Sequence, residues 1–168
     1  YKDNNNYSPV MVLDYHGKKF MLSGDAEKEA EADFVKKAKE GEGKYSVFTD
    51  DFSVDVFKLG HHGSRTSSSE DMIRAMTTPE NRANVIAVIS CGLNNSYKHP
   101  HAEVMERLAA LGFTDKNIVR TDYNGTIAMS VKGVETNGVL SYELFMGAET
   151  VVKNVNVVKT SEHAIGND

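Results

Sequence analysis

The chain has 168 residues, is 40% hydrophobic and carries a formal net charge of -5. This length is enough for one globular domain with a core of its own and too short to expect two. No stretch approaches the roughly 20 consecutive apolar residues of a membrane-spanning helix, so no membrane segment is expected. The acidic balance argues against a broadly basic nucleic-acid surface. The single cysteine, Cys91, cannot form an intrachain disulfide and indicates no particular compartment.

The first third of the chain predicts a β-hairpin and a helix. Apolar residues recur at near-alternate positions across residues 9–22, on both sides of a turn at His16-Gly17. Residues 27–39 are rich in Ala, Glu and Lys and have apolar residues four apart. That spacing predicts an amphipathic helix, closed by Gly41.

The middle of the chain alternates strand, helix and strand. Residues 54–59 predict a strand whose carboxyl end leads into two adjacent histidines. Ser67, followed by Glu70 three positions later, matches a capping box and predicts a short helix. Residues 85–90 form a near-continuous apolar run that is typical of a buried strand. This alternation indicates an α/β fold.

The last part predicts another helix and more strands. The helix should carry Pro100 in its first turn and end before Gly112. Strands are expected over residues 118–121, 127–131 and 139–145. We therefore expect one domain over residues 1–147 and a polar tail over residues 148–168.

Three clusters of possible metal ligands follow predicted strands. They are Asp25, the pair His61 and His62, and the pair His99 and His101. Imidazole and carboxylate groups together suit Zn²⁺, Mn²⁺ or Fe²⁺, and an aspartate can bridge two such ions. The residue types therefore favour a hydrolytic site with two metal ions.

Each cluster also has a purely structural interpretation. Asp25 stands just before a predicted helix, where Asp is a favoured N-cap. His61 and His62 could donate hydrogen bonds to backbone carbonyls in a loop, and His101 could simply begin a helix. The residue types alone leave both interpretations open.

The order of the motifs resembles a known family. Together they look like the second half of the metallo-β-lactamase domain attached to ComEC-type DNA-uptake proteins. The resemblance covers residues 5 to 131 and rests on five strings: Asn5-Asn6-Tyr7-Ser8, Leu22-Ser23-Gly24-Asp25, Gly60-His61-His62-Gly63-Ser64, His99-Pro100-His101, and Arg120-Thr121-Asp122. Five motifs in this order are far more specific than a single His-His-Gly-Ser.

The resemblance implies roles for the three ligands. Asp25 matches the metal-bridging aspartate of such domains. The last metal-binding histidine falls within His61-His62, and His62 is favoured because it directly precedes Gly63, as the ligand histidine does elsewhere in the superfamily. The complete domain is expected to hold two divalent ions, Zn²⁺ or Mn²⁺.

The resemblance also implies substrate contacts. His99 and His101 match a loop near the active site, where they would assist the leaving group or bind the substrate's phosphate. Ser64, Arg65 and Thr66 could add contacts to phosphate through hydroxyl and guanidinium donors.

One family motif is missing from these 168 residues: H-x-H-x-D-H, which supplies most of the ligands. We therefore expect one αβ half of an αββα sandwich, with a mixed sheet, helices on one face and an apolar second face. Its expected partner is the missing amino-terminal half of the domain or a second copy of the chain. By itself, this chain is expected to bind no metal and to be inactive.

Three functions remain open at this point. The first is a metal-dependent phosphodiesterase or nuclease acting on DNA. The second is a hydrolase of a small phosphodiester, such as a phosphocholine ester. The third is a catalytically silent structural or interaction module, since the chemistry of a site cannot be read from a fold alone.

Overall fold

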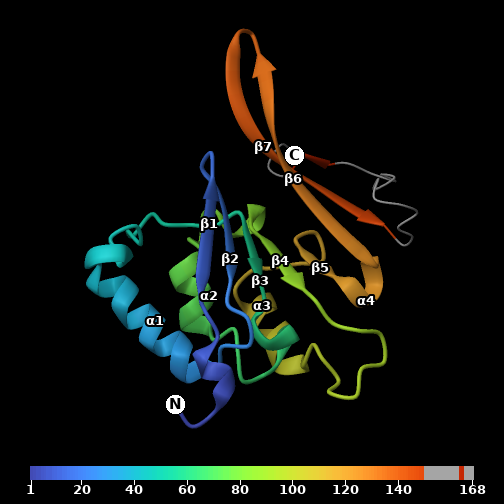
Figure 1. Cartoon of the computed structure of the whole chain (residues 1–168). Coiled ribbons are helices and arrows are strands. Elements are labelled where there is room, and N and C mark those ends of the chain that lie inside the picture. The colour runs from blue at the N-terminus through green and yellow to red at the C-terminus, as the bar shows by residue number, and fades with distance from the viewer. Residues whose placement is uncertain (150–162, 165–168) are drawn as a thin grey trace.

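The computed structural model describes residues 1–149 and 163–164. Its main sheet has five strands in the order β1-β2-β3-β4-β5 (Figure 1). Strand β1 pairs antiparallel with β2, and the other neighbours pair in parallel. The strands are β1 (Met11–Tyr15), β2 (Lys18–Leu22), β3 (Val56–Lys58), β4 (Ile86–Ile89) and β5 (Ile118–Arg120). This mixed sheet with its helices confirms the predicted α/β fold class.

One face of the sheet is buried beneath helices. The helices are α1 (Lys28–Glu40), α2 (Glu70–Met76) and α3 (Ala102–Ala110), while the short α4 (Thr121–Asn124) follows β5 and contributes no residue to the core on this face. Apolar residues of α1, α2 and α3 form a single core with side chains that point from this face of the strands. The members of that core include Phe34, Val35, Ile73, Met76, Val104 and Leu108 from the helices, and Met21, Phe57, Ala87 and Ile89 from the strands. The periodicity that predicted α1 and α3 therefore marks the sides of these helices that meet the sheet.

A long hairpin covers part of the opposite face. It consists of β6 (Thr126–Thr136) and β7 (Val139–Glu149), with the short β8 (His163–Ala164) paired to β7. Leu144 of β7 is buried and packs in a second core with Val56, Ile86 and Val119 of the main sheet. Figure 1 shows that the far half of the hairpin projects well beyond the sheet.

The rest of that face is apolar and open to solvent. Strand alternation places Met11, Leu13 and Leu22 on the same side of the sheet as Phe20 and Val56, which pack in the second core. Met11, Leu13 and Leu22 are nevertheless exposed, because the hairpin does not cover them. This is the face where a second layer of a sandwich would pack, and that layer stays a prediction. Among residues 1–149 and 163–164, no helix has both the length and the apolar character needed to cross a bilayer.

Two predicted boundary roles were wrong. The N-cap of α2 is Ser69, whose hydroxyl accepts from the amide of Met72 at 3.3 Å. Ser67 is instead buried and donates to the carbonyl of Ala26 at 2.8 Å, so its hydroxyl is already engaged. Helix α3 begins after His101, which leaves Pro100 outside its first turn.

The last strands are longer than their apolar pattern indicated. Strand β7 reaches residue 149, so residues 148 and 149 of the predicted tail belong to it. Of the rest of that tail, residues 163 and 164 form β8, and residues 150–162 and 165–168 lie outside the described residues.

Leu144 offers a direct test of how the hairpin is held. The side chain is 1% exposed, so Leu144→Ala should lower the free energy of unfolding by about 2–4 kcal/mol, because it leaves a cavity between β7 and the sheet. Leu140, on the same strand, is 59% exposed and serves as the control. Urea unfolding should show Leu140→Ala within about 0.5 kcal/mol of wild type. Equal losses in both variants would contradict this packing.

Candidate functional site

The predicted ligands gather at one edge of the main sheet. Strands β2, β3 and β4 are parallel, so the loops that follow them meet at the same edge, where α/β proteins commonly bind ligands. A cavity of about 480 Å³ lies there. Its lining residues are Asp25, His61, His62, Ser90, Cys91, Gly92, Asn95, Tyr97 and His99.

The turn after β3 has an unusual backbone. His61 and His62 adopt left-handed conformations, with φ of 46° and 57°, and Gly63 follows with φ of 81°. A Cβ atom on Gly63 would lie 2.7 Å from Cβ of Pro100, so the turn needs glycine there. Left-handed non-glycine residues cost free energy and cluster at functional sites. The amide of His61 donates to the carbonyl of Gly24 at 2.9 Å, which ties this turn to the loop of Asp25.

His62 has the geometry of a metal-binding histidine. Its Nδ1 lies 2.7 Å from the carbonyl oxygen of Ser90. Because a carbonyl can only accept, Nδ1 must carry the proton and donate it. In the neutral ring, Nε2 then presents a lone pair, and this atom lies 3.6 Å from Oδ1 of Asp25. Ligand histidines typically have this arrangement, with one ring nitrogen held by a carbonyl and the other facing the metal.

Asp25 is not a helix cap. The N-cap position of α1 is Glu27, which makes no side-chain capping bond. The amide of Asp25 donates to the hydroxyl of Ser8 at 3.2 Å, so the Asn-Tyr-Ser segment before β1 supports this loop. The carboxylate of Asp25 is therefore left to line the cavity beside His62.

His61 faces a different carboxylate. Its buried Nδ1 lies 3.3 Å from Oε1 of Glu27 and has no hydrogen-bond partner among the described residues, since that contact meets only the distance of an ion pair. The two adjacent histidines thus lie against different carboxylates: His62 against Asp25 and His61 against Glu27.

His99 sits at the centre of a group of imidazoles. Its ring centroid lies 4.8 Å from that of His101, 5.7 Å from that of His61 and 6.4 Å from that of His62. Burial lowers the pKa of His99, the nearby imidazoles lower it further, and the charge of Asp25 opposes them. His101 is the N-cap residue of α3, and its Nδ1 accepts from the amide of Arg65 at 3.0 Å.

The predicted phosphate contacts lie beside the cavity and do not line it. The hydroxyls of Ser64 and Thr66 lie 3.0 Å apart, and Thr66 donates to Glu27 at 2.7 Å. Arg65 forms an exposed ion pair with Glu103 of α3 at 3.2 Å. A role of these three residues in binding phosphate stays a prediction.

The end of β5 is joined by hydrogen bonds to Cys91, one of the residues that line the cavity. Arg120 pairs with Asp122 through two hydrogen bonds of 2.7 and 3.0 Å, and this pair raises the pKa of Arg120 and lowers that of Asp122. Thr121 exchanges hydrogen bonds with the backbone of Cys91, at 2.9 and 2.7 Å. Burial raises the pKa of the Cys91 thiol, so this thiol stays neutral.

Two of the described side chains lie at the spacing expected for two ligands of one metal ion. Two ligands of a tetrahedral zinc, each bound at about 2.1 Å, lie about 3.4 Å apart. The 3.6 Å between Asp25 Oδ1 and His62 Nε2 therefore fits one shared ion. Within residues 1–149 and 163–164, no third His, Cys, Asp or Glu completes such a group. A complete site needs ligands from elsewhere.

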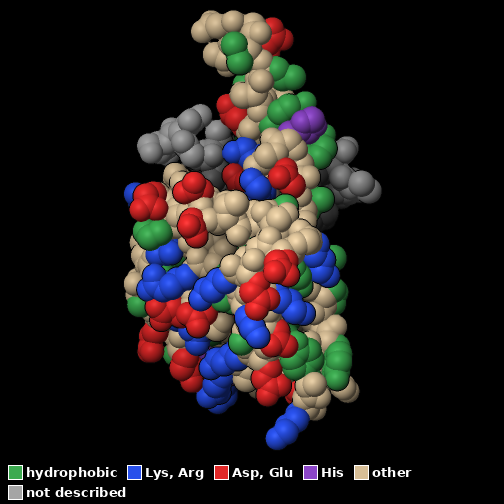
Figure 2. All heavy atoms as spheres, turned by 90° about the vertical axis from the view of Figure 1, so that its left-hand side faces the viewer, with side chains coloured by type: hydrophobic (Ala, Val, Ile, Leu, Met, Phe, Trp, Pro, Cys, Tyr) green, Lys and Arg blue, Asp and Glu red, His purple; other side chains and the backbone are tan. Residues whose placement is uncertain are grey.

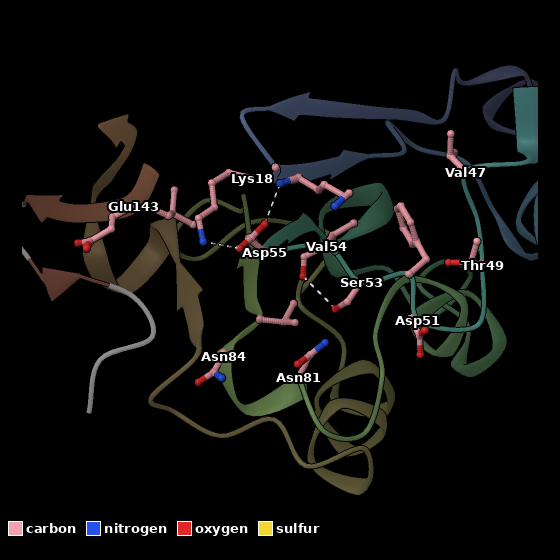
Figure 3. Close-up of a pocket in the computed structure, with 15 residues that line it drawn as sticks. Lys18, Val47, Thr49, Asp51, Ser53, Val54, Asp55, Asn81, Asn84 and Glu143 are labelled. Atoms are coloured by element: carbon pink, nitrogen blue, oxygen red, sulfur yellow. Dashed lines mark hydrogen bonds and ion pairs between the residues drawn. The ribbon is translucent and has the colours of Figure 1, made fainter. Parts of the chain in front are cut away.

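A larger hollow lies at the opposite edge of the sheet. Its volume is about 610 Å³, and it is lined by residues that precede β3 and β4 (Figure 3). Lys18 pairs with Asp55 across it at 3.2 Å, and the other carboxylate oxygen of Asp55 accepts from the amide of Lys19 at 2.8 Å. The charges drawn together there neutralise one another, and no histidine lines this hollow.

The surface offers no broad basic area on the side that carries α1. Figure 2 shows Lys and Arg side chains intermixed with Asp and Glu over this face. This mixture agrees with the acidic net charge of -5. This face therefore offers no continuous basic area for a nucleic-acid backbone.

The sequence analysis missed the buried carboxylate that supports the site. Glu31 of α1 is 1% exposed and accepts from the amides of Ser68 and Ser69 at 2.6 and 2.8 Å. Arg107 of α3 donates to the carbonyls of the same loop. One signal was available, because Glu31 lies four positions before the buried Val35, on the apolar side of the helix.

Comparison with known proteins relates the chain to parts of much longer proteins. It is 36% identical over 128 residues to ComE operon protein 3 of Bacillus subtilis, which covers 76% of this chain and 14% of that protein. It is 32% identical over 145 residues to competence protein ComA of Neisseria gonorrhoeae, covering 85% of this chain and 18% of that protein.

A third homologue is recombination protein 2 of Haemophilus influenzae, 36% identical over 105 residues, which covers 62% of this chain and 11% of that protein. The chain thus matches between 11% and 18% of the length of these three relatives. No family model and no solved structure matches the chain.

Glu31 predicts a large stability effect. Glu31→Ala should lower the free energy of unfolding by about 2–4 kcal/mol, because the buried amide of Ser68 and the half-buried amide of Ser69 lose a charged acceptor. Glu40, exposed at the other end of the same helix, is the matched control. Urea titration should show Glu40→Ala within about 0.5 kcal/mol of wild type. A Glu31→Ala protein as stable as wild type would rule out this support.

His99 predicts a pH dependence. Without metal, its pKa should lie below the ordinary value of 6.5, mainly because of burial. Neutral His99 therefore contributes stability that is complete above 6.5 and is lost as the pH falls through the lowered folded pKa. NMR titration of the ring protons should show this low midpoint, and His101→Asn should raise it by removing one of the imidazoles that lower the pKa of His99. A midpoint at or above 6.5 would contradict the burial of this ring.

Proposed function

We propose that this chain is the carboxyl-terminal half of a metal-dependent phosphodiesterase domain that acts in competence. One observation carries the proposal: His62 Nε2 faces Asp25 Oδ1 at 3.6 Å, while Nδ1 of the same ring is held by Ser90. A neutral imidazole lone pair opposite a carboxylate is an arrangement that a divalent cation would satisfy. A second segment, carrying the missing H-x-H-x-D-H ligands, would complete the site.

Each residue of the cavity has a role in this proposal. Asp25 and His62 would hold a divalent ion, which when bound supplies Lewis-acid polarisation of a phosphoryl oxygen and a nucleophile at neutral pH. His61, against Glu27, would support the ligand turn. His99, with its lowered pKa, is neutral near pH 7 and could accept or return a proton at the leaving oxygen, and His101 would assist it.

The exposed apolar strand face supports a missing half of the domain. Met11, Leu13 and Leu22 are exposed on the side of the sheet away from the helices. Large exposed apolar areas usually mark an interface. The longer relatives could supply this half from the same chain, since the matched region is only 11–18% of their length. Self-association would be the alternative cover.

The substrate we propose is a phosphodiester of DNA. One relative is named a competence protein and another a recombination protein, and both names favour a nucleic-acid substrate. A small phosphodiester such as a phosphocholine ester is the second candidate, which the acidic net charge of -5 favours. A silent interaction module would keep the fold without metal or turnover.

The isolated chain provides the first test. It should hydrolyse bis-p-nitrophenyl phosphate no faster than buffer in Mn²⁺ or Zn²⁺, because fewer than three protein ligands rarely hold a catalytic zinc. Joined to or mixed with a segment that carries H-x-H-x-D-H, it should gain metal-dependent turnover. Turnover by the isolated chain would show that the ligands have been misassigned, and no turnover in the completed protein would favour the silent module.

Variants of the completed protein test the ligand assignment. His62→Ala and Asp25→Ala should each lower bound metal, measured by elemental analysis, and reduce activity by at least about 100-fold. His61→Ala should keep most of the metal with a milder loss of activity. His16→Ala, in the turn between β1 and β2, is the control histidine variant and should retain both. If His61→Ala loses metal while His62→Ala keeps it, the assignment of the two residues is reversed.

A further inference from the structure

Tyr97 stands out among the residues that line the cavity. Its side chain is 75% exposed, and no hydrogen bond of its hydroxyl is found among the described residues. Its observed contact is with His99, with ring centroids 5.7 Å apart and planes 22° from parallel. Large exposed aromatic rings that contribute little to the fold are often binding residues.

The ring continues a row that starts at the proposed metal ligand. The ring of His99 is nearly parallel to that of His62, with an angle of 14° between the planes and 6.4 Å between the centroids. Tyr97, His99 and His62 therefore line the cavity in sequence, from its open rim to the residue beside Asp25. A flat group stacked on the outer ring would place its attached phosphate near the imidazole of His99, the middle ring of the row.

The loop that carries Tyr97 is held in place before any ligand binds. The side-chain nitrogen of Asn95, Nδ2, donates to the carbonyls of Gly92 and His99 at 2.8 and 2.7 Å. The side-chain oxygen of Asn95 accepts from the backbone amide of His99 at 2.8 Å. One side chain thus links both ends of the loop. A ring fixed in this way loses little conformational entropy when it binds a ligand.

We propose that Tyr97 is a substrate-binding residue that stacks on a nucleobase next to the phosphodiester bond. This inference rests on the proposed function, and it adds the residue that would favour DNA over a choline ester. Base stacking on one aromatic face tolerates any base and contributes substantially to single-strand binding. Lys98, the next residue, forms no ion pair among the described residues, and its positive charge would favour a nucleic-acid strand on this loop.

The composition of the cavity disfavours the choline alternative. Quaternary ammonium groups are bound in cages of several aromatic rings. Among the described residues that line this cavity, Tyr97 is the only Phe, Tyr or Trp. The remaining rings are imidazoles, which repel a cation when they are protonated. A single open aromatic face fits a planar base better than it fits a trimethylammonium group.

Binding by the whole 168-residue chain, in EDTA and at low salt, tests this inference without requiring hydrolysis. The probe is a fluorescein-labelled oligothymidylate of about 12 nucleotides, within the usual site sizes for single strands. An abasic strand of equal length is the matched ligand, because it keeps the phosphates and lacks the bases. Fluorescence anisotropy should show wild type binding the base-bearing strand about tenfold more tightly.

Three variants test whether the preference for the base-bearing strand depends on the ring of Tyr97. Tyr97→Ala should reduce the preference for bases to within about twofold, while Tyr97→Phe should keep it, because stacking needs only the ring. Tyr15→Ala is the control, since Tyr15 is also exposed and lies in β1 at the other end of the sheet. The proposal is overturned if wild type shows no preference, if Tyr97→Ala retains it, or if Tyr15→Ala loses it equally.

The outcomes also separate this inference from the proposed function. If Tyr97 supports base-dependent binding but the completed protein never hydrolyses a phosphodiester, the proposed phosphodiesterase activity is wrong and the stacking role of Tyr97 stands. If the completed protein hydrolyses a phosphodiester but the chain shows no preference for the base-bearing strand, only the stacking role of Tyr97 is wrong. If Tyr97→Ala weakens binding of p-nitrophenyl phosphocholine and leaves both strands unchanged, the ring is an ammonium contact and the inference fails.

Discussion

The hydrogen bond from His62 Nδ1 to the carbonyl of Ser90, 2.7 Å long, joins the loops after β3 and β4 and determines which ring nitrogen faces Asp25. The left-handed turn at His61 and His62 is the backbone geometry in which this bond forms. Glu31 of α1 holds the next part of the same segment by accepting from the amides of Ser68 and Ser69. The parallel order of β2, β3 and β4 brings these loops to one edge. The proposed chemistry depends on that convergence.

Local patterns predicted most of the fold. The alternation in residues 9–22 predicted the hairpin of β1 and β2, although its apolar residues face both sides of the sheet. The spacing of Ala30, Phe34 and Ala38 predicted α1, because these residues form the buried side of the helix. The apolar runs predicted β3 and β4 to within two residues at each end. The length of the β6–β7 hairpin was underestimated, because much of it projects into solvent and shows little apolar alternation.

The candidate site was predictable as a set of residues and not as a geometry. Histidines and an aspartate after successive strands indicated Asp25, His62 and His99, and the parallel sheet brings them together. Sequence could not reveal that Ser67 bonds to Ala26 and leaves capping to Ser69, since that contact spans 41 residues. Tyr97 was equally hidden, because its position on the rim depends on how Asn95 folds the loop.

The most direct measurement is anomalous X-ray diffraction from crystals of the completed domain grown with Zn²⁺ or Mn²⁺. The account predicts an anomalous peak within about 2.0–2.2 Å of both His62 Nε2 and an oxygen of Asp25, with Nδ1 of that ring still bonded to Ser90. A metal held by His61 and Glu27, or no metal beside Asp25 in an active protein, would contradict it.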